Sequence, residues 1–244
     1  MAAIVRFEHA AFPVGLGFVA GAMDAFGFVA LHGLLPAHVT GNLVLLAVEL
    51  SRGQREVGMK IAAVPIFAFG VAISAWCIGI LREREKDAFL PALSAQAALI
   101  AVCLAVSLLL PRPATPDDVP AVVVGCFALL AMALQNVIMR LVLNNLPPTT
   151  VMTGNITHVV GDTIAFVCHF PSLRNREDQE RRLGRQAARM VLTLSGFAVG
   201  CLVAALGYRA IGASILILPM AALVLLLAFG QAVLVGSRRT VSRA

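Results

Sequence analysis

A few polar side chains inside long apolar runs are the residues of this sequence that could do chemistry. Asp24 lies about two-thirds of the way along the apolar run of residues 11–31. A carboxylate at the centre of a bilayer costs about 2.5–3.5 kcal/mol on insertion scales, so such a residue usually faces a cavity, a partner or an ion path. In the second half, His158 and Asp162 stand one helical turn apart. They could relay a proton or share a cation, because imidazole titrates near neutral pH, or they could form a structural hydrogen-bonded pair.

The tripeptide Thr-Gly-Asn occurs twice in matching surroundings, as Thr40-Gly41-Asn42 and as Thr153-Gly154-Asn155. The same offset of 113 residues (153 minus 40) places Glu49 on Asp162. Prolines precede both copies, and since proline disfavours helix at the residue before it, each copy is predicted to begin a fresh helix, with Thr as a reasonable N-cap. A helix start at membrane depth has free N–H groups that could hold a polar or anionic ligand, or Thr and Asn could satisfy those groups themselves.

Further polar residues lie at a similar place before each tripeptide. Asp24 precedes Thr40 by 16 residues, and Gln135 and Asn136 precede Thr153 by 18 and 17. Arg140 follows one turn later. Two interpretations stay open: these side chains bind a solute or an ion, or Gln135 and Asn136 bond a neighbouring helix while Asp24 pairs with Arg140.

A polar stripe follows the second tripeptide, because Asn155, His158, Asp162 and His169 fall within roughly 60° of one another on a helix of 3.6 residues per turn. In the first half only Asn42 and Glu49 match it, and Glu49 could be a helix-end carboxylate that reaches for the membrane interface. No third ligand has a spacing that suggests a metal site.

Composition requires elements that cross a membrane. Of the 244 residues, 59% are hydrophobic and only 13% are charged, and the mean hydropathy is +0.90. A soluble domain has a different composition. Six apolar runs have about the 20 residues that cross a hydrocarbon core: residues 11–31, 61–81, 89–110, 120–139, 190–208 and 213–235. We therefore predict an all-α integral membrane protein with six transmembrane helices.

The common order of elements in the two halves predicts an internal duplication. The expected units are a first repeat of residues 1–110, a linker of residues 111–119 and a second repeat of residues 120–244, within a single membrane domain. If the Thr-Gly-Asn segments are re-entrant, each half has three spans and the repeats are inverted; if they are short spans, each half has four and the repeats are parallel. Residues 38–50, at roughly 20 Å of helix, are too short to cross comfortably, whereas residues 151–170 could cross.

The charge distribution agrees with a membrane protein and gives an orientation. The net charge of +6 comes from basic residues in loops and tails, so positive-inside topology explains it without a nucleic-acid partner. Both topologies put the Arg-rich loop of residues 174–189 and the C-terminus in the cytoplasm. The sequence has no phosphate-binding loop, dinucleotide fingerprint or nucleophile elbow, so we expect no cofactor, no metal and no ATP-driven pump.

The segments Ala20-Gly21-Ala22-Met23-Asp24-Ala25 and His38-Val39-Thr40-Gly41-Asn42, with Gln135-Asn136 and Thr149-Thr150-Val151-Met152-Thr153-Gly154, resemble the YoaK family of bacterial multipass membrane proteins (domain-of-unknown-function family 1275). The resemblance covers nearly the whole chain and implies a bacterial inner-membrane protein of about six helices. That family is one of unknown function, so no substrate, cofactor or catalytic residue is carried over.

The sequence therefore predicts a secondary transporter for a small solute, coupled to a proton or a cation. Asp24 and the stripe of His158 and Asp162 would take up the ion, and the two Thr-Gly-Asn helix starts would hold the solute. The expected partners are the lipid bilayer and that solute, and a homo-oligomer is left open. We do not expect an enzyme; an intramembrane enzyme and a non-transporting scaffold or sensor are the alternatives.

Overall fold

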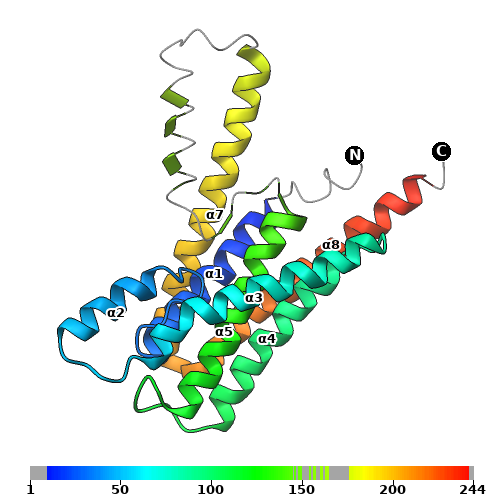
Figure 1. The fold of residues 1–244 in the computed structure, drawn as a ribbon. Coiled ribbons are helices and arrows are strands. Elements are labelled where there is room, and N and C mark those ends of the chain that lie inside the picture. The colour runs from blue at the N-terminus through cyan, green and yellow to red at the C-terminus, as the bar shows by residue number, and fades with distance from the viewer. Residues whose placement is uncertain are drawn as a thin grey trace.

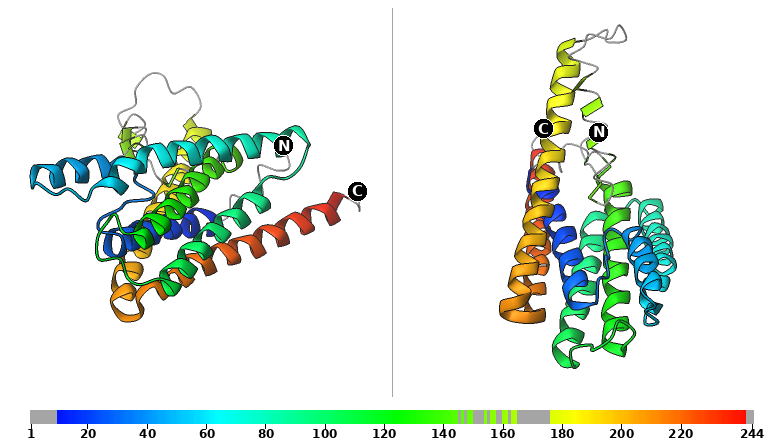
Figure 2. Two further views of the ribbon diagram at one scale, coloured as in Figure 1. Left: turned by 60° about the horizontal axis from the view of Figure 1, so that its bottom comes forward. Right: turned by 90° about the vertical axis from the view of Figure 1, so that its left-hand side faces the viewer.

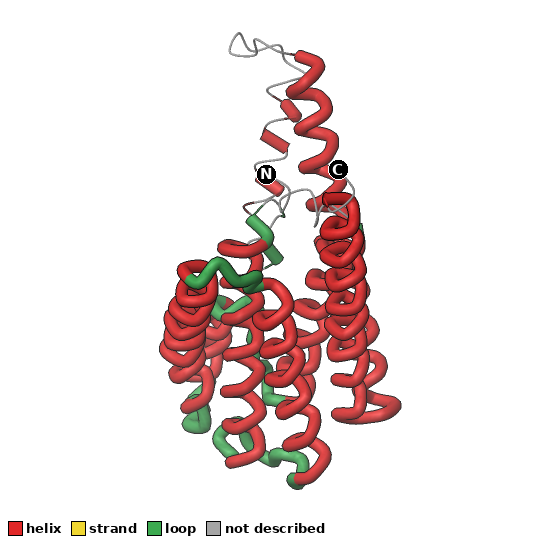
Figure 3. The backbone as a smooth tube through the Cα atoms, turned by 90° about the vertical axis from the view of Figure 1, so that its right-hand side faces the viewer, coloured by secondary structure: helices red, strands yellow, loops and turns green. Residues whose placement is uncertain are grey.

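A computed structural model describes residues 10–144, 146, 148, 149, 154, 156, 157, 160, 161, 163, 164 and 176–241, with the backbone alone for 176–183 and 233–241. In these residues every regular element is a helix (Figures 1 and 3). The elements are α1 (Ala11–Ala30), α2 (Gly41–Ser51), α3 (Gly58–Glu83), α4 (Phe89–Leu109), α5 (Val119–Val137), a π-helical turn (Ile138–Val142), α7 (Arg176–Ile211), a 3-10 turn (Gly212–Leu216) and α8 (Ile217–Val241).

Five helical stretches of the described chain are long and apolar enough to cross a membrane. They are Ala11–Ala30, Gly58–Glu83, Phe89–Leu109, Val119–Val142 and Gly184–Ala232. The last stretch contains both α7 and α8, joined through the 3-10 turn, so all six predicted apolar runs lie in helices. Helix α2 is apolar but has only 11 residues, which is too short to span.

Helices α1 and α5 form the centre of the bundle. In each of these two stretches, 67% of the most apolar 18-residue segment is buried, against 22–33% for the other spanning stretches. Helix α1 packs against α7 and α8, whereas α5 packs against α3 and α4, and α4 also contacts α8. The views in Figure 2 agree with this arrangement, with α7 running beside α1. The outer helices therefore present apolar side chains to the surroundings, as lipid contact requires.

The helix ends meet at two opposite ends of the bundle. At one end, which we call the linker end, the Lys60 ammonium group donates to the carbonyl oxygen of His32 at 2.7 Å, and Asp117 accepts from the backbone N–H groups of Gly58 and Met59. The linker between α4 and α5 and the turn between α7 and α8 also lie there, at the bottom of Figure 1.

Aromatic pairs close the opposite end of the bundle. Phe12 lies 5.6 Å from Phe89 and 5.7 Å from Phe229, measured between ring centroids, so the start of α1, the start of α4 and the later part of α8 are neighbours. Successive long helices therefore alternate in direction.

Glycines bring α1 and α7 into close contact. A Cβ added at Gly17 or Gly21 would lie within 3.0 Å of the carbonyl oxygens of Thr193 and Phe197, respectively. The relation is mutual, because Gly196 and Gly200 lie against backbone oxygens of α1 in the same way. Residue numbers at the contacts rise together along both helices, from Gly17 at Thr193 to Gly21 at Phe197, so α1 and α7 are parallel. Small residues permit this kind of close backbone packing between membrane helices.

Candidate functional site

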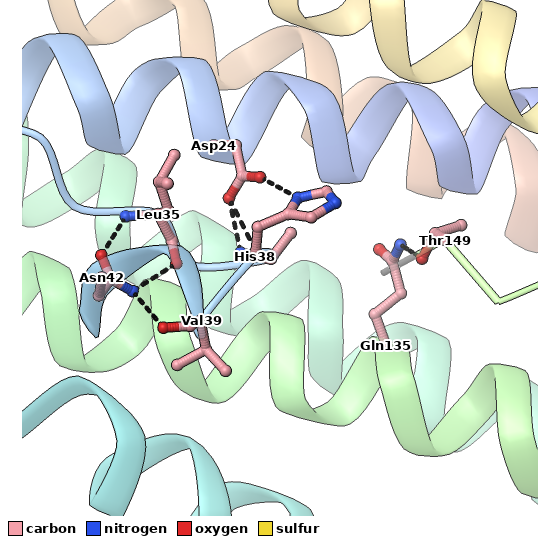
Figure 4. A network of polar contacts seen from close by, with 8 residues as sticks. Asp24, Leu35, His38, Val39, Asn42, Gln135 and Thr149 are labelled. Carbon is pink, nitrogen blue, oxygen red and sulfur yellow. Dashed lines mark hydrogen bonds and ion pairs between the residues drawn. The ribbon is translucent and has the colours of Figure 1, made fainter. Parts of the chain in front are cut away.

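The carboxylate of Asp24 holds the chain segment that connects α1 to α2. Asp24 is 4% exposed, and its Oδ1 accepts from the backbone N–H of Ala37 at 2.6 Å and of His38 at 3.4 Å. Its Oδ2 lies 2.6 Å from Nδ1 of the His38 imidazole (Figure 4). A residue near the end of α1 is thus bonded to residues 13 and 14 positions later, so the chain folds back along α1 before α2 begins.

Asn42 closes the same segment from its other side. Its Oδ1 accepts from the N–H of Leu35 at 2.8 Å, and its Nδ2 donates to the carbonyl oxygens of Leu35 at 2.9 Å and Val39 at 3.1 Å (Figure 4). Asn42 is fully buried. The described contacts of this Asn are therefore to the backbone of its own turn, which matches the alternative in which the motif satisfies its own polar groups.

The start of α2 differs from the prediction at Thr40. Thr40 occupies the N-cap position, but its side chain makes no capping hydrogen bond and its backbone is already helical, so the expected Thr cap is wrong. Instead, the first N–H groups bond to carbonyl oxygens of the preceding turn, as from Gly41 to His38 at 2.8 Å and from Leu43 to Thr40 at 3.1 Å. A tight backbone turn therefore performs the role expected of the side chain.

A second polar network is centred on Gln135. Gln135 on α5 is fully buried, and its Nε2 donates to the Thr149 hydroxyl at 3.0 Å (Figure 4). The same Nε2 donates to the carbonyl oxygen of Leu16 at 2.9 Å. Its Oε1 accepts from Nε2 of the buried Gln96 on α4 at 2.6 Å. The separation of 14 residues between Gln135 and Thr149 equals that between Asp24 and His38.

The far end of α2 is attached to α3 by an ion pair. The Lys60 ammonium group is 2.5 Å from Oε1 of Glu49, and the Lys60 side chain is only 2% exposed. The sequence interpretation of Glu49 as a carboxylate reaching for the membrane interface is thus wrong, because Glu49 turns inward to a buried lysine. Apart from Asn42, no residue of α2 is buried, so the two ends carry its attachment.

An open groove of about 460 Å³ runs beside Asp24. Its walls come from α1, the turn before α2, and α7, and include Asp24, Phe28, Leu35, His38, Phe197 and Cys201. The His38 ring packs edge-on against Phe197, with ring centroids 5.1 Å apart. The side chain of His38 is 34% exposed, whereas that of Asp24 is 5% exposed, so the imidazole is the accessible member of the pair.

One family model, described as a protein of unknown function (DUF1275), matches residues 12–229. The chain belongs to this DUF1275 family. Searches of curated proteins and of solved structures found no match. The family match and the apolar helices together identify a multi-helix, membrane-type member of the DUF1275 family.

The structure places the predicted site residues of this DUF1275 chain in different surroundings. Asp24 and Asn42 contact the same turn, and Gln135 belongs to the second network. Arg140 is exposed in the π-helical turn and forms no ion pair with Asp24, whose partner is His38, so that predicted pairing is wrong. Thr153, Asn155, His158, Asp162 and His169 lie outside the described residues, whereas Gly154 and Asn136 are described.

Three further polar residues were not predicted as site residues. They are His38, Lys60 and Gln96, which pair with Asp24, Glu49 and Gln135. His38 stands two residues before the first tripeptide, and Lys60 is one of two lysines in the chain and opens an apolar run, so both carried a signal. Gln96 carried none beyond its polarity.

A histidine and a carboxylate in direct contact can hold one proton between them and pass it on. Among the described residues no group of three or more His, Cys, Asp or Glu side chains could hold a metal ion. The arrangement around Asp24 therefore provides a single titratable pair beside a mostly apolar groove, at a point where the chain reverses.

Proposed function

We propose that this DUF1275 protein consists of two inverted repeats, residues 1–110 and 120–244, joined by the linker of residues 111–119. The helices α1, α3 and α4 would correspond to α5, α7 and α8. Exchanging the members of each pair converts the α1–α7 contact into the α5–α3 contact, and the α1–α8 contact into the α5–α4 contact, all of which occur. The alternation of helix directions supports the inversion, because the linker starts the second half from the opposite side.

We further propose that α2 is a re-entrant segment. It begins beside Asp24, within the length of α1, and ends at Lys60 at the linker end, which is also where α1 ends. Its 11 residues fit such a path and are too few for a crossing. The Thr-Gly-Asn segment of the second half would behave likewise, which gives six spans. With the Arg-rich loop and the C-terminus in the cytoplasm of a bacterial inner membrane, the linker end faces outward.

On this architecture the protein is a secondary transporter for a small solute, and the Asp24–His38 pair is its proton-binding element. The observation that carries the proposal is the carboxylate of Asp24, 4% exposed within a span, which holds a chain reversal together beside an open groove. Transporters of inverted-repeat type place their substrate and coupling-ion sites where helices are interrupted near the membrane centre. Intramembrane carboxylates commonly mark proton relays.

Protonation gives the pair a way to move α2. An ionised Asp24 accepts charge-assisted hydrogen bonds from Ala37 and His38, each worth about 1.5–3 kcal/mol. A proton on the carboxylate removes the charge and weakens both bonds. A loss of about 1.4 kcal/mol would already change the equilibrium between attached and detached positions of the turn tenfold. Since only Asn42 of α2 is buried, the attachments of α2 besides Asp24 are mainly the Asn42 hydrogen bonds and the Glu49–Lys60 ion pair.

The second half would contribute a fixed counterpart. Gln135 holds Thr149 as Asp24 holds His38, but an amide has no proton to exchange, so the Gln135 network does not respond to pH as the Asp24–His38 pair does. In this proposal the start of α2 at Thr40 and Gly41 lines the solute path, while the buried Asn42 holds the turn behind it. From the sequence we expect the second tripeptide, Thr153-Gly154-Asn155, to contribute in the same way. From the sequence we expect His158 and Asp162 to serve the same path, and Asn136 and Arg140 would lie at its edge.

Uptake by reconstituted vesicles tests the proposal without a known substrate. Purified protein is placed in liposomes, a bacterial metabolite extract is supplied outside as the probe, and a pH gradient of either sign is imposed. The vesicle contents are then measured by mass spectrometry. We expect wild-type vesicles to accumulate at least one component in a gradient-dependent way and Asp24→Asn vesicles to lose this accumulation. Equal contents in wild-type and protein-free vesicles would refute transport.

Asp117→Asn provides a matched control. Asp117 also accepts two backbone N–H bonds at a helix start, but it lies at the linker end and away from the groove. Uptake by this variant should equal that of the wild type. Size-exclusion profiles and melting temperatures of both variants separate loss of function from loss of fold.

A further inference from the structure

A second cavity lies at the linker end, on the other side of α1 from the groove at Asp24. It has a volume of about 280 Å³ and is formed where the ends of α1, α4 and α7, the start of α5 and the turn before α8 come together. Its polar lining comes from Ser107, Arg112 and Tyr208, and its apolar lining includes Phe26, Leu108 and Val124. The volume is at the lower limit for small-molecule pockets, so a ligand that fills it must be small.

Arg112 brings to this cavity a positive charge without an ion-pair partner among the described residues. It forms no ion pair with any residue in the described part of the chain. The two acidic residues that follow in the linker are engaged elsewhere: Asp117 accepts from the N–H groups of Gly58 and Met59, and Asp118 accepts from Ala114 and Thr115. The guanidinium group is therefore available to an external anion, which it can bind through two parallel hydrogen bonds.

The backbone around Arg112 is restrained, which fixes where its side chain leaves the chain beside the cavity. Arg112 lies between Pro111 and Pro113, so both its neighbours have a fixed φ and Arg112 itself is confined to extended conformations. The carbonyl oxygen of Pro113 lies 3.3 Å from Nε2 of His32, at the end of α1. On the opposite wall, Gly212 has φ +60°, and a Cβ there would lie 3.1 Å from Nη2 of Arg112. The guanidinium group thus lies against the glycine of the turn between α7 and α8.

Tyr208 supplies a second donor and an apolar surface. Its ring packs edge-on against Phe26 with centroids 5.9 Å apart, and the tyrosine lines the cavity from α7. Its hydroxyl group forms no hydrogen bond with any residue that the structure describes. A phenolic O–H next to apolar surface generally takes a polar partner, and a bound anion would be one.

We propose that this cavity binds a small organic anion, whose carboxylate or phosphate group contacts Arg112 and Tyr208 and whose apolar body packs against Phe26 and Val124. An anionic lipid headgroup offers the same charged group and is the alternative source of it. The site involves neither Asp24 nor His38, so it does not rest on the proposed proton coupling. If both proposals hold, the transported solute is an organic anion that first binds here.

Equilibrium dialysis with radiolabelled benzoate tests the site in detergent-solubilised full-length protein, with protein-free micelles as the blank. We expect saturable binding that Arg112→Gln weakens about tenfold or more, since a charge-assisted contact is lost. Arg209→Gln is the matched control, because Arg209 is an exposed arginine next to Tyr208 that does not line the cavity, and its affinity should stay within about twofold of wild type. Tyr208→Phe should weaken binding less than Arg112→Gln does.

Equal binding by the wild type and Arg112→Gln, or an equal loss in Arg112→Gln and Arg209→Gln, would overturn the proposal. The same measurement in nanodiscs identifies the source of the anion. Equal benzoate affinity in phosphatidylcholine discs and in discs containing phosphatidylglycerol supports a free solute. Displacement of benzoate by phosphatidylglycerol would overturn the solute form of the proposal and assign the site to a lipid headgroup. Melting temperatures of the variants, measured alongside, show whether each is folded.

Discussion

Replacing Gly21 by alanine should destabilise the protein by forcing α1 away from α7. The added Cβ would lie within 3.0 Å of the backbone of Phe197, a distance that real Cβ atoms essentially never show. A backbone carbonyl cannot rotate away as the end of a long side chain can, so the two helices must separate along an interface that also contains Gly17, Gly196 and Gly200. Overpacking of this kind costs about 1–3 kcal/mol.

Gly79→Ala is the control for this prediction. Gly79 lies in α3, and a Cβ there would meet nothing within 4 Å, so this variant records only the higher helix propensity of alanine. For a chain of this size 1 kcal/mol shifts the melting temperature by about 2–4 °C. We therefore expect Gly21→Ala to melt about 2–12 °C below Gly79→Ala in detergent. Equal melting temperatures would refute the close helix contact.

Three other perturbations have defined outcomes. Asn42→Ala leaves backbone groups of the buried turn without partners and should lower the free energy of unfolding by at least about 2 kcal/mol. An unchanged melting temperature would contradict the role of Asn42 in holding this turn. Lys60→Met isolates Glu49 and should lower the melting temperature, whereas adding Glu49→Gln should restore part of it; no recovery in the double variant would argue against the ion pair. Hydrogen bonds from the N–H and hydroxyl of Thr115, followed by the N–H of Ala114, lower the pKa of Asp118. Its stabilising contribution is therefore present above the pKa of an unfolded Asp, about 3.9, and is lost as the pH falls through the folded value. The difference in melting temperature between wild type and Asp118→Asn should vanish in acid. A difference that grows in acid would contradict a lowered pKa of Asp118.

The long helices could be predicted from the sequence because bilayer length and apolar composition determine them locally. All six predicted runs lie in helices, and the α2 helix begins at Gly41, inside the first tripeptide. The prolines and the glycine act through the backbone of their own neighbours, so their effect needs no knowledge of the rest of the fold.

The partners of the buried polar groups could not be predicted in the same way. One interpretation of the sequence pairs Asp24 with Arg140, because Arg140 carries the opposite charge. In the structure the chain reversal brings His38 to Asp24 instead. Glu49 reaches Lys60 only because α3 begins where α2 ends. Which side chains meet depends on the register between helices, and hydropathy contains no information about register.

Proton exchange at Asp24 during solute transport is the central step of the proposed mechanism. The most direct measurement is the internal pH of vesicles loaded with a pH-sensitive dye, when the component that wild-type vesicles accumulate is added outside without an imposed gradient. We expect a change of internal pH with wild type and with Asp117→Asn, acidification for symport or alkalinisation for antiport, and no change with Asp24→Asn. Solute entry without any pH change, or an equal pH change with Asp24→Asn, would contradict this mechanism.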